Sequence, residues 1–158
     1  MIEVINGDIF ETDANIILHQ VNCQGVMGSG VAKQVREKYP IVFEYYKAWC
    51  DDITLNPIIE GKHGLLGSIQ TVYYDVENNR CIVNLFAQDQ FGYDGRCYTD
   101  YDALKRCLQQ VNNEFKDEFV AIPYLMGCHR GGGDWNLVSK MIEETLVDCT
   151  PIFYKWSE

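Results

Sequence analysis

Apolar residues along the chain occur in two patterns, as short continuous runs and as positions three or four residues apart. This indicates strands alternating with helices. The runs that predict strands cover residues 2–5, 15–21, 68–75, 80–86, 119–123 and 152–156. Helices are expected over residues 29–39 and 40–50, after Thr99, and after Asp134. The pair at 68–75 and 80–86 is separated by a polar turn typical of a hairpin. This order predicts an α/β fold, a three-layer α/β/α sandwich with a mixed central sheet.

Polar residues and proline mark the expected ends of the helices. Pro40 is favoured in the first turn of a helix, and Thr99-x-x-Asp102 resembles a capping box. Asp134 is a good N-cap for the last helix. The inward positions of that helix are expected to be Leu137, Val138, Met141 and Ile142. Residues 51–67 are rich in glycine and polar residues, and they predict a loop.

A strand, a glycine loop and a helix follow one another in the segment HQVNCQGVMGSGVAKQVREKYP, residues 19–40. Backbone N–H groups at such a helix start attract an anion. The loop lacks the Lys-Ser/Thr of a P-loop, and Gly28-x-Gly30 lacks the third glycine of a dinucleotide fingerprint. A structural turn therefore remains the alternative to a phosphate site. His19 and Asn22 precede the loop and offer an imidazole and an amide for recognising a sugar.

A second glycine loop, MGCHRGGGDW at residues 126–135, favours the phosphate interpretation. Three consecutive glycines cost backbone entropy, which indicates that the backbone approaches something closely. Arg130 offers a charge-assisted contact to a phosphate, although a mobile surface loop is the plainer alternative. Both loops follow strands and precede helices, so we expect them to converge on one cleft at the carboxyl ends of the strands.

Several further residues have both an ordinary and a functional interpretation. Asp8 follows the first strand and is either a turn residue or an acceptor for an exocyclic amine. A lone histidine in a strand, such as His19, is usually a core residue, but its neighbours favour a site. Cys23 and Cys128 lie in the two loops, where packing explains them without a nucleophilic role. The three histidines and the scattered cysteines have no ligand spacing, so no metal and no cofactor are expected.

Composition narrows the class of protein. A length of 158 residues with 47% hydrophobic residues predicts a single domain over residues 1–158. The formal charge of −10 argues against general nucleic-acid binding, which depends on lysine and arginine. Seven cysteines without a C-x-x-C motif are typical of reduced thiols in a cytoplasmic protein. No leader and no membrane segment are expected, and we expect a monomer that acts on a small molecule.

These motifs together resemble the macrodomains, the ADP-ribose-binding family. The resemblance runs along the whole chain, from V-x-N-G-D-I at the start to the closing strand. Between them stand H-Q-V-N-C-Q-G-x-M-G-S-G, N-L-F-A-Q at 84–88 and G-C-x-x-G-G-G-D-W at 127–135. The chain looks most like the small stand-alone branch that contains ADP-ribose-1″-phosphate phosphatases and terminal ADP-ribose glycohydrolases.

The resemblance implies a role for each matched residue. Asp8 would bind the adenine amine, Ile9 would pack on the base, and Asn22 would contact the distal ribose. The residues that would line the phosphates and distal ribose are Gly28, Ser29, Gly30 and Val31. The residues that would wrap the diphosphate are Leu125, Met126, Gly127, Cys128, His129, Arg130, Gly131 and Gly132. Trp156 would flank the adenine.

The chain also departs from the family's catalytic patterns. Ala32 stands where macrodomains that release ADP-ribose from acidic side chains often have Asp. Gln88 and Gly131 align with the Lys and Asp of the terminal glycohydrolase. These differences weaken the case for removal of ADP-ribose from proteins by those routes.

The sequence therefore favours hydrolysis of a small ADP-ribose derivative, above all ADP-ribose 1″-phosphate. His19 would act as general acid/base on the premise of an ordinary pKa near 6.5. Asn22 would orient the ribose or a water, and Asp134 would orient His19 or cap its helix. The alternatives are a non-catalytic ADP-ribose-binding module and hydrolysis of O-acetyl-ADP-ribose or of ADP-ribosylated macromolecules. An interaction protein with a vestigial pocket is the remaining possibility.

Overall fold

The computed structural model describes residues 1–156, and its elements follow the predicted order. The strands are β1 (Glu3–Asn6), β2 (Ile16–Val21), β3 (Ile58–Ile59), β4 (Lys62–His63), β5 (Ile69–Asp75), β6 (Arg80–Phe86), β7 (Phe119–Pro123) and β8 (Thr150–Lys155). The helices are the short 3-10 turn η1 (Ile9–Glu11) and α1 (Gly30–Lys38), α2 (Pro40–Asp51), α3 (Tyr101–Glu114) and α4 (Trp135–Thr145).

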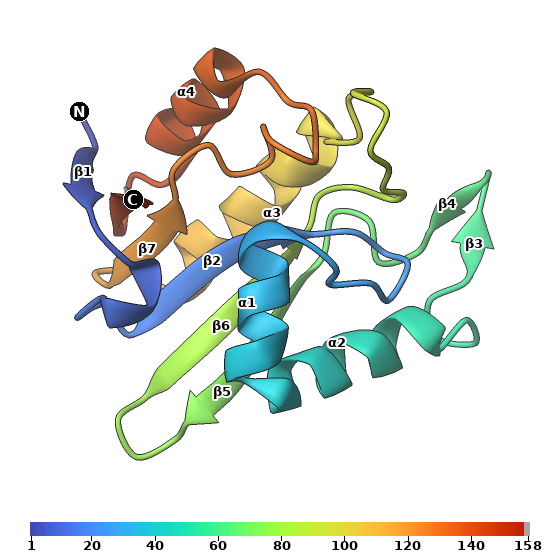
Figure 1. Cartoon of the computed structure of the whole chain (residues 1–158), viewed down its shortest axis with the longest axis horizontal. Coiled ribbons are helices and arrows are strands. Elements are labelled where there is room, and N and C mark those ends of the chain that lie inside the picture. The colour runs from blue at the N-terminus through green and yellow to red at the C-terminus, as the bar shows by residue number, and fades with distance from the viewer. Residues whose placement is uncertain (157–158) are drawn as a thin grey trace.

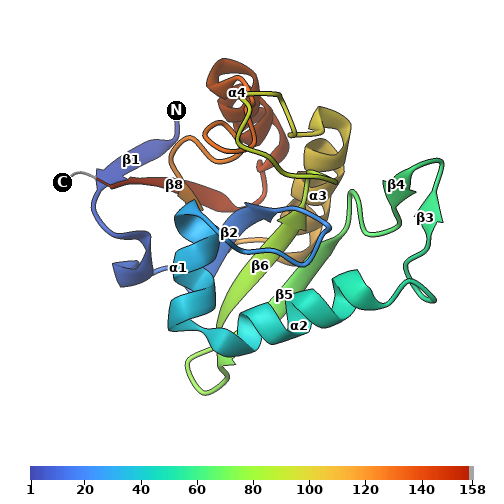
Figure 2. The same ribbon diagram turned by 45° about the vertical axis from the view of Figure 1, so that its right-hand side comes forward.

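One six-stranded sheet forms the middle layer, in the order β1-β8-β7-β2-β6-β5. Only the β5–β6 hairpin pairs antiparallel, so the sheet is mixed as the sequence predicts. Helices α1 and α2 cover one face and α3 and α4 the other (Figures 1 and 2). This arrangement confirms the three-layer α/β/α sandwich.

Strand β2 lies inside the sheet and is buried on both faces, which explains its unbroken apolar run. Ile16 and Leu18 pack in the core beneath α3 and α4, whereas Ile17 packs beneath α1 and α2. The same alternation continues to His19 and Gln20, which therefore enter opposite layers at the carboxyl end of the strand.

None of the helices in residues 1–156 is long and apolar enough to cross a membrane.

Three local predictions are wrong. The N-cap of α3 is Asp100, whose side chain accepts from Ala103 N at 3.0 Å, and Thr99 makes contacts elsewhere. Leu137 is 53% exposed, because the inward stripe of α4 runs through Val138 and Ile142. The expected loop at residues 51–67 contains the small β3–β4 hairpin.

Candidate functional site

Both glycine loops line one cavity of about 570 Å³, which confirms that they converge. The cavity opens at the carboxyl ends of β2 and β7, where ligands bind in open α/β sheets. Its lining residues are His19, Gln20, Ser29, Gly30, Val31, Ala32, Gln88, Pro123, Tyr124, Leu125, Met126, Gly127, His129, Arg130, Gly131 and Trp156. This set contains no carboxylate, although the chain carries a formal charge of −10.

Two smaller recesses extend the cavity. A recess of about 210 Å³ holds Asp8 and Ile9 and shares Gly30, Val31 and Trp156 with the cavity. A recess of about 80 Å³ holds Asn22 and Gly28 and shares Ser29 and Arg130 with it. We call the cavity and its two recesses the cleft.

The first glycine loop presents the N-terminus of α1 to the cleft. Ser29 is the N-cap residue, and its side chain makes no capping hydrogen bond. Gly30 has φ +59°, a conformation that favours glycine, and a Cβ added there would meet nothing within 4 Å. The positive φ, and not a lack of space, therefore explains the glycine at this position. No acidic residue lies in the first turn of α1, and the helix dipole therefore favours an anion here.

The second glycine loop packs against the chain's own residues 96–99. Gly131 O accepts from Tyr98 N at 2.7 Å and from Thr99 N at 2.9 Å. A Cβ on Gly132, which has φ +68°, would lie 2.2 Å from Arg96 O. The run of glycines thus permits a close backbone approach, as predicted, but Gly132 approaches the protein itself and does not line the cleft.

Asp8 and Asn22 line the two recesses, yet both are already engaged. Asp8 Oδ1 accepts from Phe10 N at 2.9 Å and caps η1. Asn22 Nδ2 donates to Val26 O at 2.9 Å, and its Oδ1 accepts from Gln24 N at 2.9 Å and Tyr46 OH at 2.8 Å. The Asn22 amide therefore shapes the first loop and keeps one N–H for a ligand.

His19 borders the cavity but is only 1% exposed. Its Nε2 lies 2.5 Å from Asn84 Oδ1, and its Nδ1 has no hydrogen-bond partner among residues 1–156. Burial lowers the pKa of His19 to about 4, and the Asn84 hydrogen bond offsets part of that effect. The premise of an ordinary pKa is therefore wrong: the ring is neutral at pH 7 and is not an imidazolium acid there.

Gln20, Gln88 and Thr99 form a hydrogen-bond network that the sequence did not predict, and the first two of these residues line the cleft. Gln20 Nε2 donates to Gln88 Oε1 and to Thr99 Oγ1, both at 2.8 Å. Thr99 Oγ1 in turn donates to Gly127 O at 2.7 Å. This network holds the second loop in place. The sequence places Gln20 between His19 and the first loop and Gln88 at the end of a family motif, but it does not indicate that the two side chains meet.

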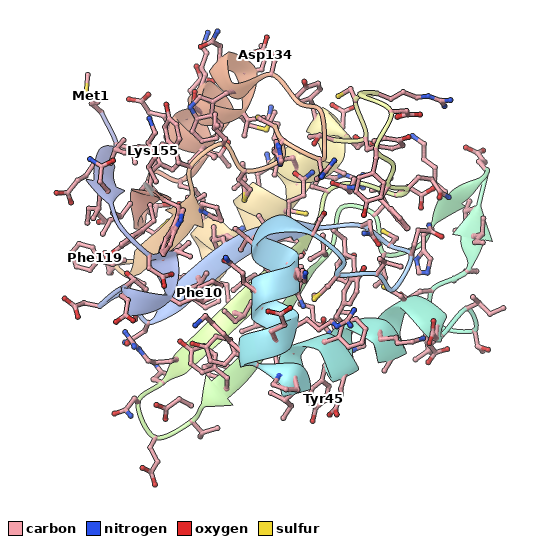
Figure 3. The ribbon with its side chains drawn as sticks, in the orientation of Figure 1. Met1, Phe10, Tyr45, Phe119, Asp134 and Lys155 are labelled. Atoms are coloured by element: carbon pink, nitrogen blue, oxygen red, sulfur yellow. The ribbon has the colours of Figure 1, made fainter. Side chains whose placement is uncertain are left out.

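Two other residues that were expected in the site, Asp134 and Cys128, lie outside the lining of the cleft. Asp134 is exposed, caps α4 through Asn136 N at 2.8 Å, and lies beside α4, away from α1 (Figure 3). It does not line the cleft, so the idea that it orients His19 is wrong. Cys128 also lies outside the lining, and burial raises the pKa of its thiol to about 11. Arg130, in contrast, lines the cleft as expected, and its guanidinium lies 4.6 Å from the centre of the Tyr93 ring.

Burial likewise raises the pKa of the Cys23 thiol, so neither loop cysteine is an activated thiolate. Within residues 1–156, no group of three or more His, Cys, Asp or Glu side chains is placed to hold a metal ion.

Known proteins provide a further test of this arrangement. No protein-family model matches the chain. The ADP-ribose 1″-phosphate phosphatase of Aspergillus oryzae is 35% identical over 182 residues, covering 93% of this chain and 90% of that protein. The DNA ADP-ribosyl glycohydrolase of Mycobacterium tuberculosis is 28% identical over 160 residues, covering 98% of this chain. The chain spans only 42% of the length of that glycohydrolase.

Solved structures agree with these relatives. The macrodomain of Mycobacterium tuberculosis DarG superimposes with a TM-score of 0.76 and 26% identity, covering 98% of this chain and 97% of that one. The alignment with the fungal phosphatase covers nearly all of both proteins at 35% identity. The chain belongs to the macrodomain family.

Proposed function

We propose that this protein binds ADP-ribose in the cleft and hydrolyses an ADP-ribose derivative, with ADP-ribose 1″-phosphate as the favoured substrate. The observation that carries the proposal is the single cavity lined by both glycine loops, with a recess at each of two polar residues, Asp8 and Asn22. A dinucleotide-like ligand has a base, a diphosphate and a second sugar, and the cleft offers a compartment for each.

The charges in the cleft support an anionic ligand. The cavity lining contains Arg130 and no carboxylate, and the N-terminus of α1 opens toward it. In the proposed pose the diphosphate lies between the two loops and the adenine lies in the recess of Asp8 and Ile9. Trp156, which is 64% exposed, flanks the base, and the distal ribose lies near Asn22 and His19.

The proposed reaction uses His19 as a neutral hydrogen-bond acceptor for a ribose hydroxyl or for the attacking water. Loop N–H groups stabilise the charge that develops on the phosphoryl oxygens. The 35% identity to the Aspergillus oryzae phosphatase, in an alignment that covers 93% of this chain, supports this choice of substrate.

Release of ADP-ribose from DNA is a second candidate. The glycohydrolase of Mycobacterium tuberculosis aligns with 98% of this chain, which favours it. The recess beside Asn22 is also lined by Phe91 and Tyr93, aromatic side chains suited to stacking on a base. Gln88 and Gly131, in the positions of the terminal glycohydrolase's Lys and Asp, weigh against it.

Calorimetric titration with ADP-ribose, followed by assays of phosphate release from its 1″-phosphate and of ADP-ribose release from modified DNA, tests the proposal. We expect binding and phosphate release. Binding without turnover on any derivative would select the binding module, and absence of binding would select a vestigial pocket.

Two glycine variants make a matched control for this titration. Gly132→Ala places a Cβ 2.2 Å from Arg96 O and distorts the second loop, so it should weaken binding. Gly61→Ala has a similar φ of +79° with nothing within 4 Å, and it lies in the turn of the β3–β4 hairpin. It should bind ADP-ribose like the unaltered protein.

A further inference from the structure

A row of three buried polar side chains crosses the sheet on the face covered by α1 and α2. His19 on β2 is opposite Asn84 on β6, and Asn84 is opposite Gln70 on β5. Their exposed fractions are 1%, 0% and 2%. Buried polar groups destabilise a fold unless they are hydrogen-bonded, so a row of this kind calls for an explanation.

The hydrogen bonds of the row are oriented from its far end. Gln70 Nε2 donates to the backbone carbonyl of Tyr45 in α2 at 3.0 Å, and a carbonyl oxygen can only accept. The side chain of Tyr45 is itself exposed on the outer side of α2 (Figure 3). The Gln70 amide is therefore fixed with its Oε1 toward Asn84, where it accepts from Asn84 Nδ2 at 3.0 Å.

The orientation of Asn84 fixes the tautomer of the imidazole. Because Asn84 Nδ2 is committed to Gln70, its Oδ1 faces His19 and lies 2.5 Å from Nε2. Two acceptors do not share a hydrogen bond, so Nε2 carries the proton. A neutral imidazole has one donor and one acceptor nitrogen, and Nδ1 is then the acceptor.

That acceptor is buried in the wall of the cavity and has no partner there among the described residues. His19 lines this cavity between the glycine loops. We propose that Asn84 and Gln70 are positioning residues that hold His19 in its Nε2–H tautomer, so that Nδ1 accepts a hydrogen bond from a hydroxyl of the ligand or from a water. This inference rests on the proposed function, because it assigns a partner within that same site.

His63 shows what a purely structural histidine looks like in this chain. Its Nε2 donates to Cys50 O at 2.9 Å, and its Nδ1 accepts from Leu65 N at 3.1 Å. Backbone groups thus satisfy both nitrogens and fix the same tautomer. His19 differs in two ways, because side chains set its tautomer and one nitrogen remains free for a ligand.

Ring-nitrogen NMR spectra of the whole unliganded protein test the row directly. Long-range ¹H–¹⁵N correlations distinguish the two neutral tautomers, and His63 provides an internal reference for the Nε2–H form. The unaltered protein should show His19 as Nε2–H. In Gln70→Met, the Asn84 amide loses its acceptor and is free to turn, so the Nδ1–H form of His19 should appear while His63 stays unchanged.

Two further variants separate positioning from packing. Asn84→Asp keeps an acceptor for Nε2 but places a carboxylate beside the ring, so Nε2 should stay protonated and His19 should become easier to protonate than in the unaltered protein. Asn112→Leu removes a buried amide that pairs with Asp148 through two hydrogen bonds in the α3–β8 region, away from the row. It should lower stability without altering the His19 spectrum.

Kinetics provide the second readout. Gln70→Met should lower kcat roughly tenfold while the affinity for ADP-ribose changes little, because the diphosphate and adenine contacts are untouched. If Gln70→Met does not fold, Asn84→Leu cuts the row at the atom that touches His19 and should give the same result.

Two outcomes would overturn the inference: an Nδ1–H tautomer in the unaltered protein, or an unchanged His19 spectrum in both Gln70→Met and Asn84→Leu. The spectra are recorded without ligand and therefore do not depend on turnover. Failure of the unaltered protein to hydrolyse any derivative would instead overturn the proposed function.

Discussion

His19 and Gln20 are neighbours on β2, and their side chains enter opposite layers of the sandwich. Each begins a hydrogen-bond network, and each leaves one buried polar atom without a partner among residues 1–156, Nδ1 in His19 and Oε1 in Gln20. The His19 network runs away from the cleft and ends on the backbone of α2. The Gln20 network runs along the rim and ends on the second glycine loop at Gly127 O.

In the proposed function, this one strand end serves two purposes. The first network is anchored in the sheet and orients a single acceptor, whereas the second is anchored in loops and positions a backbone that would surround the diphosphate. Damage to the first network should therefore affect turnover, and damage to the second should affect affinity.

Removal of the imidazole should have the largest effect. His19→Ala should lower kcat by a factor of about 10² or more, in the range of general acid–base and hydrogen-bonding catalysts, with little change in the affinity for ADP-ribose. Steady-state phosphate release and calorimetry measure the two quantities separately. A fully active His19→Ala protein would remove His19 from the mechanism.

Of His19 and Gln20, only His19 titrates, and acid should therefore destabilise the protein through His19. The unfolded chain binds a proton near pH 6.5, but the folded chain only near pH 4, so stability falls as the pH drops through this window. The shift corresponds to roughly 3 kcal/mol of unfolding free energy. This contribution to stability is fully present above pH 6.5 and is lost as the pH falls toward 4. Urea unfolding at pH 7 and pH 4.5 measures it.

The pH slope should be smaller in His19→Gln than in the unaltered protein, because the titrating group is gone. Gln20→Leu removes no titratable group and should keep the full slope. Equal slopes in all three proteins would mean that His19 keeps an ordinary pKa.

Loss of the Gln20 amide should weaken binding more than turnover. Gln20→Leu leaves Gln88 Oε1 and Thr99 Oγ1 without their donor, at a cost of about 1–3 kcal/mol, and loosens the second loop. Calorimetry should show a fall in ADP-ribose affinity of roughly tenfold. The matched control is Gln110→Leu, which removes a surface amide that donates to Gly67 O and Arg106 O in α3. The control variant should bind normally.

The smallest effect is expected at Asp134, which belongs to neither network. Asp134→Ala should lower the free energy of unfolding by about 1 kcal/mol through loss of the α4 N-cap. Turnover should stay within twofold of the unaltered protein, by the same phosphate assay. A tenfold or larger loss of kcat would instead indicate that Asp134 is a catalytic residue.

The two networks also mark how far sequence reasoning reaches. Hydrophobic periodicity located β2 and both glycine loops to within a residue or two, because such patterns depend on neighbours a few positions apart. It misassigned Thr99, whose hydroxyl bonds the second loop while Asp100 caps α3. Both residues are good helix caps locally, and a contact 28 positions along the chain decided between them.

The sequence by itself determined the order of strands and helices, the mixed three-layer fold and the positions of the two glycine loops. Each of these follows from local backbone preferences and from the spacing of apolar residues. Only the tertiary structure decided the hydrogen-bond partner and the pKa of His19. Its partner stands 65 positions away on β6, and that pairing depends on strand register. Its pKa depends on how completely the helices exclude water, which no local pattern records.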